Sequence, residues 1–311
     1  MKIIHSIPCT DSLKAHICEI YNLDLGDFVL FHNTIGAAYL AESAMGKLVF
    51  KLSKQNMFDE GQRAAQICDY LRRDGLFVPE IIPTASGGLI AEIDFPEGIR
   101  CGQLFRHIDG EKPKKEDFAA IGALLGHFHN AMQNYPGDIP LKFDYNSVVN
   151  DLSEVLQCID KNMADDFVCA AKYLWEKLEN APLGIIHGDF GEHNIIKTQS
   201  GNLALIDFDA VCRMPAIIDI LIMCNRNAEL GRADIEKMHG NINDLMAGYR
   251  AVYEDFVIDT DNLLRWLALR HFKRLADSIL GVRDADPARA KMFLAMVHEW
   301  LIEWKKMEGI L

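Results

Sequence analysis

Long apolar runs are missing from this sequence. No uninterrupted apolar stretch approaches the roughly 18 residues from which a membrane-spanning helix is predicted. The first residues, MKIIHSIPCTDSLKAHICEIY, carry an early lysine but no apolar stretch of the length that a signal peptide needs. We therefore expect a soluble, cytoplasmic protein that does not enter a membrane.

Positive charge is also scarce. Lys and Arg total 32 against 45 Asp and Glu, which gives a formal net charge of −13. An acidic protein without a basic stripe repels a phosphate backbone, so nucleic acid is not an expected partner. The 8 cysteines are scattered without a C-x-x-C pair or a Cys/His cluster, so they predict neither a zinc site nor a disulfide framework. Internal repeats are absent as well, which excludes a solenoid.

The first hundred residues of the 311-residue chain predict strands and one helix. β-rich segments lie on both sides of Ala44-Met45-Gly46, which marks a hairpin turn. Apolar positions at helical spacing then predict a helix closed by Gly75, and two more strands surround Gly87-Gly88. The predicted elements are strands at 27–43 and 47–54, a helix at 58–75, and strands at 80–86 and 88–94.

A polar connector containing Gly, Pro and Lys separates this region from a mostly helical one. Helical patterns cover 116–133, much of 150–180 and nearly all of the chain from about 216, with a hairpin at 185–209 between them. With 50% hydrophobic residues, the chain is long enough for two lobes with separate cores. We expect an α+β protein with an N-terminal lobe at 1–104, a hinge at 105–110 and a larger C-terminal lobe at 111–311.

The hairpin segment IIHGDFGEHNIIKTQSGNLALIDFD carries acids where its strand-like runs begin or end. If Ser200-Gly201 is a two-residue loop, Asn194 lies opposite Asp207. If the loop is Gly201-Asn202 instead, Asn194 lies opposite Asp209. Directly opposed residues have Cβ atoms about 4.5 to 5.5 Å apart. Either register predicts an amide and a carboxylate that hold one cation.

A site with so few oxygen ligands suits Mg²⁺, which keeps several waters and is completed by phosphates. An arbitrary D-x-D is more often a pair of solvated acids. Asp189 reverses this interpretation, because it precedes Asn194 by five positions and follows His187 by two. D-x-x-x-x-N is the spacing of a kinase catalytic loop, in which the Asp orients or accepts the proton of the substrate hydroxyl and the Asn binds a metal ion. The pattern therefore predicts phosphoryl transfer.

HGDFGEHN followed by LIDFDAVCRMPAIIDI resembles the aminoglycoside phosphotransferase and choline kinase family, whose pattern is H-G-D-x4-N, then I-D-F/W-D/E, then a further Asp. The order of the lobes extends the resemblance over most of the chain. It implies a two-lobed protein-kinase-like fold that uses ATP and Mg²⁺. The implied roles are Asp189 as catalytic base, Asn194 and Asp207 as metal ligands, Asp209 as an accessory acid at the metal, and His187 and Asp219 as structural support.

The same resemblance indicates the nucleotide-binding residues. Lys51 occupies the strand position of the family's phosphate-contacting lysine, and HNTIGAA would cover the phosphates with Asn33, Thr34 and Gly36. Glu60 is the expected partner of Lys51, with Asp59 and Asp69 left open as alternatives. Adenine would contact backbone groups of Leu104, Phe105 and Arg106 in the hinge. His129, on a helix similar to the family's L-x-x-L-H helix, is expected to be a hydrogen-bonded core residue.

Two other functional classes fit the residues less well. A metallophosphoesterase also uses Asp, Asn and His, but the D-x-H and G-D-x-x-D elements of its two-metal site are missing. A nucleotide-binding pseudokinase would not need the base, the metal pair and the lysine that are all present. A protein Ser/Thr kinase of the same fold stays open, although only about a dozen residues between Asp207 and Asp219 are available for a peptide platform.

A small molecule with a hydroxyl group is therefore the expected acceptor. The C-terminal helices would build its pocket. Aromatic residues on them could bind a cationic amine beside Glu299, although aromatic residues at helical spacing are more often core residues. These aromatic residues are Tyr249, Trp266, Trp300 and Trp304. Aminoglycosides, amino alcohols, amino acids and sugars all remain candidate acceptors, and the sequence does not predict an oligomeric state.

Overall fold

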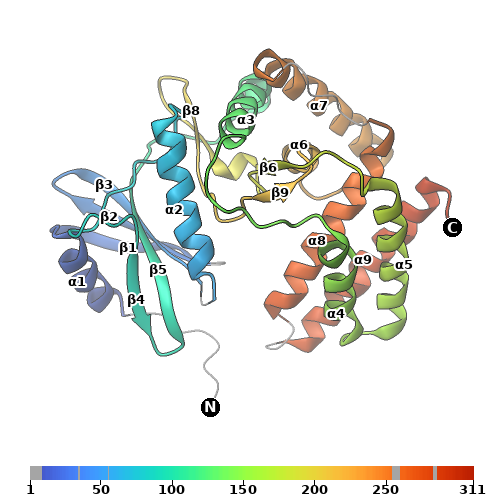
Figure 1. The fold of residues 1–311 in the computed structure, drawn as a ribbon, viewed down its shortest axis with the longest axis horizontal. Helices are drawn as coiled ribbons and strands as arrows, with labels where there is room; N and C mark the ends of the chain where they lie inside the picture. The colour runs from blue at the N-terminus through green and yellow to red at the C-terminus, as the bar shows by residue number, and fades with distance from the viewer. Residues whose placement is uncertain (1–8, 34–35, 55, 254–259, 283–285) are drawn as a thin grey trace. The chain divides into compact units, whose positions relative to one another are not determined.

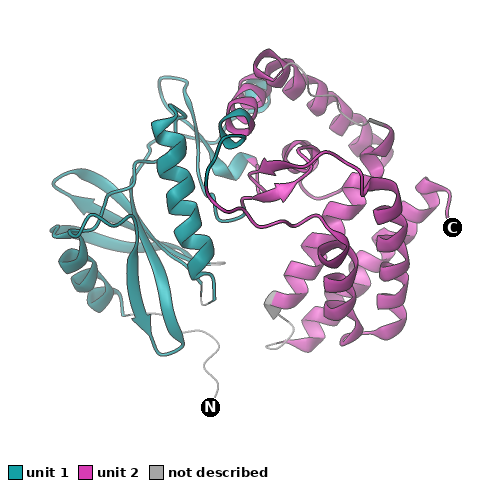
Figure 2. Ribbon diagram, viewed as in Figure 1, with its two compact units in different colours: residues 1–117, 130–136, 192–210 teal, residues 118–129, 137–191, 211–311 magenta. Residues whose placement is uncertain are grey.

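A computed structural model describes residues 9–33, 36–54, 56–253, 260–282 and 286–311. The chain divides into two compact units, which Figure 2 shows in different colours. Unit 1 comprises residues 1–117, 130–136 and 192–210, and unit 2 comprises residues 118–129, 137–191 and 211–311. Within the described ranges, no helix is both long and apolar enough to cross a membrane.

Unit 1 is built on an antiparallel sheet with strand order β1-β2-β3-β5-β4. Its strands are β1 (Leu25–Asn33), β2 (Ala37–Ser43), β3 (Gly46–Leu52), β4 (Ala91–Phe95) and β5 (Gly98–Arg106). Its helices α1 (Thr10–Tyr21) and α2 (Phe58–Arg73) are drawn with the sheet in Figure 1. The predicted helix at 58–75 is confirmed, and Gly75 follows it with a left-handed φ of 94°.

Three predictions for this region are wrong. The range 27–43, predicted as one strand, holds most of β1 and all of β2, which pair with each other. Helix α1 was not predicted, yet its buried Leu13, Ile17 and Tyr21 recur at helical spacing and pack into the core under the sheet. Residues 80–86 were predicted as a strand, but they form only a single bridge between Ile81 and Phe105. Proline at position 83 has no N–H to donate to a sheet ladder, which explains the interruption.

A short hairpin completes unit 1. It consists of a 3-10 turn (Glu192–Asn194), β7 (Ile195–Lys197) and β8 (Leu203–Leu205). Backbone hydrogen bonds between Glu111 and Lys197 run in both directions, at 2.9 and 2.8 Å, and join the hairpin to the segment after β5. The sequence had assigned this hairpin to the C-terminal lobe, whereas it groups with unit 1.

Unit 2 is mainly helical and contains the small sheet formed by β6 (Gly184–Ile186) and β9 (Cys212–Met214). Its helices are α3 (Phe118–Met132, whose last three residues group with unit 1), α4 (Asp151–Gln157), α5 (Lys161–Leu178), α6 (Ile217–Cys224), α7 (Arg232–Val252), α8 (Leu263–Val282) and α9 (Pro287–Glu308), with a π-helical turn at Asn146–Asn150 and a 3-10 turn at Thr260–Asn262. Figure 1 shows α4, α5, α8 and α9 side by side.

Two glycines let α3 and α7 approach closely. A Cβ atom built on Gly122 would lie 1.8 Å from the backbone oxygen of Leu245, and one on Gly248 would lie 1.7 Å from that of Ala119. No side chain fits at either position without moving the backbone. The two helices therefore pack backbone to backbone, which fixes the spacing of the side chains that they carry.

Candidate active site

The sheet of unit 1 separates Lys51 from the core. Leu48, Phe50 and Leu52 of β3 are completely buried in the cluster that includes α1. Successive side chains of a strand point to opposite faces, so Lys51 lies on the other face of the sheet. It pairs with Ala38 on β2 and with Gln103 on β5.

Lys51 contacts two carboxylates of unit 1. Its Nζ atom lies 2.6 Å from Asp207 Oδ1 and 2.8 Å from Asp209 Oδ2. Burial acts to lower the pKa of Lys51, but the two carboxylates outweigh it and raise that pKa above its ordinary value. Burial raises the pKa of Asp209, against the opposing effect of Lys51. Lys51 thus stays charged and holds both acids in one place.

Glu60 is not part of this ion pair. The structure joins Lys51 to Asp207 and Asp209, and no Lys51–Glu60 pair occurs among the described residues. The negative charge of Glu60 nevertheless contributes to the raised pKa of Asp209, so Glu60 lies near enough to act on that carboxyl group. The sequence did not predict that Lys51 pairs with acids more than 150 positions away and not with Glu60 on the next helix.

The hairpin register differs from both predicted ones. Ile195 pairs with Leu205 and Ile196 with Ala204, so Asn194 is aligned with Ile206 and neither Asp207 nor Asp209 lies directly across from it. The Ile206 N–H donates to the Asn194 carbonyl at 3.0 Å. The reason is a three-residue loop in which Gly201 adopts a left-handed φ of 85°, instead of the two-residue loop that was predicted.

Asp207 follows β8 with a left-handed φ of 67°. Aspartate tolerates this conformation better than most residues. The chain turns at Asp207, and the next residue, Phe208, is buried. As a result, the carboxylates of Asp207 and Asp209 both contact Lys51. Asn194 is itself buried in unit 1, on the 3-10 turn at the start of the hairpin.

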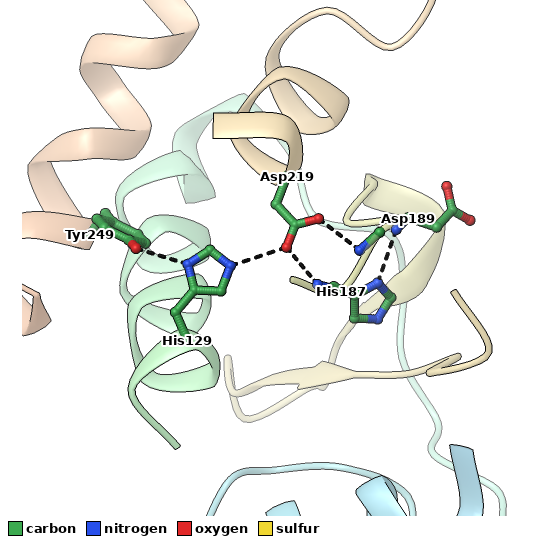
Figure 3. Close-up of polar contacts among 6 residues, drawn as sticks. His129, His187, Asp189, Asp219 and Tyr249 are labelled. Carbon is green, nitrogen blue, oxygen red and sulfur yellow. Dashed lines mark hydrogen bonds and ion pairs between the residues drawn. The ribbon is translucent and has the colours of Figure 1, made fainter. Parts of the chain in front are cut away.

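Asp189 lies in unit 2, in the loop after β6. Two carboxylate oxygens of Asp219 fix this loop, because Oδ2 accepts from the His187 N–H at 2.7 Å and Oδ1 accepts from the Gly188 N–H at 2.9 Å. Gly188 has a left-handed φ of 79° that favours glycine. The Asp189 N–H faces the ring of His187, and its carboxylate points away from Asp219 (Figure 3). The loop thus presents the Asp189 carboxylate outward from a fixed backbone.

The polar network continues into the core of unit 2. His129 Nε2 lies 3.1 Å from Asp219 Oδ2, and His129 Nδ1 lies 2.8 Å from the Tyr249 hydroxyl (Figure 3). His129 is buried, as the sequence predicted for a hydrogen-bonded core residue. Because α3 carries His129 and α7 carries Tyr249, the close glycine packing of these two helices supports the loop of Asp189.

The other residues predicted to bind the nucleotide lie on β1, before β2 and on β5. Asn33 ends β1 and is exposed, Gly36 directly precedes β2, and Thr34 lies outside the described residues. The backbone groups of two predicted hinge residues are already used within unit 1. The Leu104 carbonyl accepts from the Ile82 N–H, and the Arg106 N–H donates to the Glu80 carbonyl, both at 2.8 Å. The single donor of Arg106 is therefore already used, whereas the Leu104 carbonyl can accept one more hydrogen bond.

Three of the aromatic residues considered for the acceptor pocket are core residues. Tyr249 and Trp304 are completely buried, and Trp266 is 1% exposed. Trp304 Nε1 donates to the Leu264 carbonyl at 3.1 Å, which joins α9 to α8. They offer no exposed aromatic surface to a cationic amine, so the alternative interpretation as core residues is correct for them.

The sequence model of the phosphotransferase enzyme family, abbreviated APH, matches residues 32–254. The chain belongs to this family. An uncharacterized protein of Deinococcus radiodurans is 21% identical over 217 residues, which cover 66% of this chain and 64% of that protein. The chain thus spans somewhat less than two thirds of the length of this curated relative.

Solved structures show the same fold. A microcompartment-associated aminopropanol kinase matches with a TM-score of 0.75 and 18% identity over 97% of this chain and 99% of that one. An amicoumacin kinase, solved in complex with AMP-PNP, Ca²⁺ and a ligand abbreviated Ami, matches with a TM-score of 0.73 and 17% identity over 93% of both chains. A choline kinase of Cryptosporidium parvum matches with a TM-score of 0.61 and 16% identity over 97% of this chain and 98% of that one. The α+β, two-lobed kinase-like fold predicted from the sequence is confirmed.

Proposed function

We propose that this member of the phosphotransferase enzyme family transfers the γ-phosphoryl group of ATP to a hydroxyl group of a small molecule. The observation that carries the proposal is the meeting of Lys51 with Asp207 and Asp209. A lysine on a sheet and two acids distant in sequence form the charge pattern that a nucleotide phosphate group and its cation require. The resemblance to the family assigns phosphate contact to Lys51 and the metal ion to Asp207 and Asp209, which supports the proposal.

Asp189 takes the role of general base. Its carboxylate points outward from a loop whose backbone N–H groups are fixed by Asp219 (Figure 3). A fixed carboxylate can orient an acceptor hydroxyl and accept its proton as the oxygen attacks the γ-phosphorus atom. This step moves a phosphoryl group from ATP to the acceptor oxygen, and ADP leaves.

The acids of unit 1 fit a divalent cation. Asp209 Oδ1 is buried and has no hydrogen-bond partner among the described residues, so it can serve as a ligand without breaking a bond. Asp207, Asp209 and Asn194 would hold Mg²⁺ together with nucleotide phosphates. The described residues contain no cluster of three or more His, Cys, Asp or Glu side chains suited to a metal, but Mg²⁺ needs only one or two carboxylates beside water and phosphate. The cation would supply neutralisation of phosphate charge.

The remaining nucleotide contacts follow from the sheet. Val49 lies on the same strand face as Lys51, and the register pairs it with Leu40, which in turn pairs with Val29. Val29 is 57% exposed although it is apolar. This stripe offers an apolar surface on the face of the sheet that carries Lys51, and we propose that the adenine ring packs against it.

An ADP-release assay of the purified chain with ATP and Mg²⁺ tests the proposal, with aminoglycosides, choline, ethanolamine, homoserine and simple sugars as acceptors. We expect acceptor-dependent ADP release. Asp189→Asn should lower kcat by about 100-fold to 10,000-fold, the usual contribution of a general base, while ATP binding measured by calorimetry persists. Asp165→Asn, at an exposed position of α5, is the control. Unchanged turnover of the Asp189 variant would contradict the assignment.

A second variant tests the metal site separately. Asp207→Ala should weaken the binding of ATP in the presence of Mg²⁺ and have a smaller effect in the presence of EDTA. ATP binding that does not depend on Mg²⁺, without any ADP release, would favour a pseudokinase instead. Phosphorylation of added proteins but of no small hydroxyl compound would favour a protein kinase.

A further inference from the structure

Three arginines of unit 2 gather around the segment that follows α6. Arg226 lies in this segment, and Arg270 and Arg274 lie one turn apart on α8. The guanidinium group of Arg270 donates to the carbonyls of Asn225 and Arg226. Arg274 Nη1 donates to the same Arg226 carbonyl at 2.6 Å. Two guanidinium groups therefore converge on one backbone oxygen.

None of the three guanidinium groups forms an ion pair with a carboxylate among the described residues. Arg270 is only 5% exposed, and its Nε atom is buried without a hydrogen-bond acceptor. Backbone carbonyls carry only a partial charge, so they do not replace a counterion. A buried cation that no carboxylate contacts is costly, and an anionic ligand that contacts the cluster would offset this cost.

Lowered pKa values on α8 indicate an excess of positive charge around the three arginines. Burial and then the charges of Arg274 and Arg270 lower the pKa of His271 to about 4, so this ring is neutral at pH 7. Burial, together with Arg274 and Arg226, also lowers the pKa of Arg270 to about 9. The acid that opposes this decrease is Asp189, the proposed base. The cluster is therefore close enough to Asp189 for their charges to interact.

Packing contacts hold the cluster in place. The ring of His271 lies against that of Trp300 on α9, with centroids 4.3 Å apart. Trp300 Nε1 donates to the Ala228 carbonyl at 2.6 Å, and Ala228 has a left-handed φ of 54°. These contacts fix the backbone of Arg226 to α8 and α9, and the guanidinium groups of Arg270 and Arg274 are held by their hydrogen bonds to it, so these two groups need little ordering when they bind a ligand.

We propose that the acceptor carries an anionic group, a carboxylate or a phosphate, which Arg226, Arg270 and Arg274 bind while its hydroxyl lies at Asp189. The proposal rests on the phosphotransferase function given above and narrows its acceptor class. Arg226 and Arg274 are exposed and reachable by a ligand, whereas Arg270 adds its charge from the interior. Planar guanidinium groups bind carboxylate and phosphate oxygens in pairs, which gives strong and directional recognition.

Pairs of acceptors that differ by one anionic group test this directly. Homoserine differs from 3-aminopropan-1-ol, and threonine from 1-aminopropan-2-ol, by one carboxylate. Glycerate and glycerol 3-phosphate, each compared with glycerol, separate a carboxylate from a phosphate. We expect kcat/KM to be at least about 10-fold higher for the anionic member of a pair, the size of a charge-assisted hydrogen bond. Equal or higher kcat/KM for the members without an anionic group would overturn the proposal.

Arginine variants connect any preference to the cluster. Arg274→Gln and Arg226→Gln should raise KM for the acceptor with the anionic group by about 10-fold or more and leave KM for the partner that lacks this group nearly unchanged. Arg232→Gln is the control, because this arginine is exposed on α7 and, within the described ranges, forms an ion pair with Glu236 alone. Because Arg270 also binds the end of α6, Arg270→Lys keeps its charge and should retain part of the preference. A preference that survives in both glutamine variants would overturn the proposal.

The two proposals can fail separately. ADP release with only uncharged or cationic acceptors would support phosphotransfer and overturn the anionic acceptor class. If no acceptor is turned over, the function fails, and calorimetry with glycerate and glycerol 3-phosphate then decides the second question. Binding that is lost in Arg274→Gln and kept in Arg232→Gln would support an anion site, and the absence of binding would overturn it.

Discussion

Lys51 Nζ lies 2.6 Å from Asp207 Oδ1, although 156 positions separate the two residues in the chain. Asp209 shares the same lysine, and its other oxygen is buried without a partner in the described part of the chain. The single positive charge of the lysine thus offsets part of the repulsion between the two carboxylates. This relationship decides how unit 1 should respond to loss of the lysine and to Mg²⁺.

Lys51→Met should raise KM for ATP by about 10-fold or more, because a charged contact to phosphate is lost. It should also lower the melting temperature in the absence of Mg²⁺, since the two carboxylates lose their counterion. Added Mg²⁺ should raise the melting temperature of this variant by more than it raises that of the wild type. Differential scanning calorimetry with and without Mg²⁺ measures this effect.

Lys47→Met is the matched control for that experiment. Lys47 lies on the same strand and is exposed, and it has no ion pair among the described residues. Its melting temperature and KM for ATP should stay close to the wild-type values. If both lysine variants behave alike, the specific role of Lys51 is wrong.

Tyr249→Phe tests the network behind the loop of Asp189. The variant removes the hydroxyl that lies 2.8 Å from His129 Nδ1 in the core. We expect a loss of about 1 kcal/mol in the free energy of unfolding, because a buried polar atom is left unsatisfied. kcat should decrease as well, since His129 contacts the carboxylate that fixes the loop of Asp189. Urea unfolding and ADP release measure the two effects, and Tyr145→Phe, at an exposed ring, should change neither.

Gly122→Ala tests the packing of α3 against α7. The new Cβ would lie 1.8 Å from the Leu245 carbonyl oxygen, so the helices must separate. We expect the free energy of unfolding to decrease by about 3 kcal/mol, the upper part of the range for overpacked sites. Gly240→Ala on α7 is the contrasting variant, because no atom lies within 4 Å of its new Cβ. It should gain about 0.5 to 1 kcal/mol from helix propensity, and equal effects of the two variants would contradict the close packing.

His271 should make stability depend on pH. Its pKa is lowered from 6.5 to about 4, first by burial and then by Arg274 and Arg270. The unfolded chain takes up a proton near pH 6.5 that the folded protein excludes until about pH 4, so acidification in this window favours unfolding. Urea midpoints at about pH 7.5 and about pH 5 should therefore differ less in His271→Gln than in the wild type. His239→Gln, at an exposed position on α7, should keep the wild-type difference.

Much of the fold was readable from the sequence because local patterns were strong. The apolar spacing of 58–75 and its closing Gly75 predicted α2 correctly. Helix α1 was not predicted, although its buried Leu13, Ile17 and Tyr21 follow the same spacing. The strand predicted at 80–86 failed because a β-rich composition says nothing about whether a neighbouring strand is free to pair.

The sequence by itself determined which residues are the candidates for the chemistry. The order His187, Asp189, Asn194, Asp207 and Asp209 predicted a kinase-like site because each residue type has a fixed chemical use at that spacing. It also determined the family, since the motif and the order of elements are properties of the chain alone.

Only the tertiary structure decided which of these residues meet. Gly201 adopts a left-handed conformation and makes a three-residue loop, which moves Asn194 out of line with both acids. Lys51 pairs with Asp207 and Asp209 and not with Glu60. The arginine cluster could not be foreseen either, because Arg226 and Arg270 are joined by helix packing over more than 40 positions. Contacts between residues that are far apart in the chain depend on how the helices and strands pack, and local sequence patterns do not predict that packing.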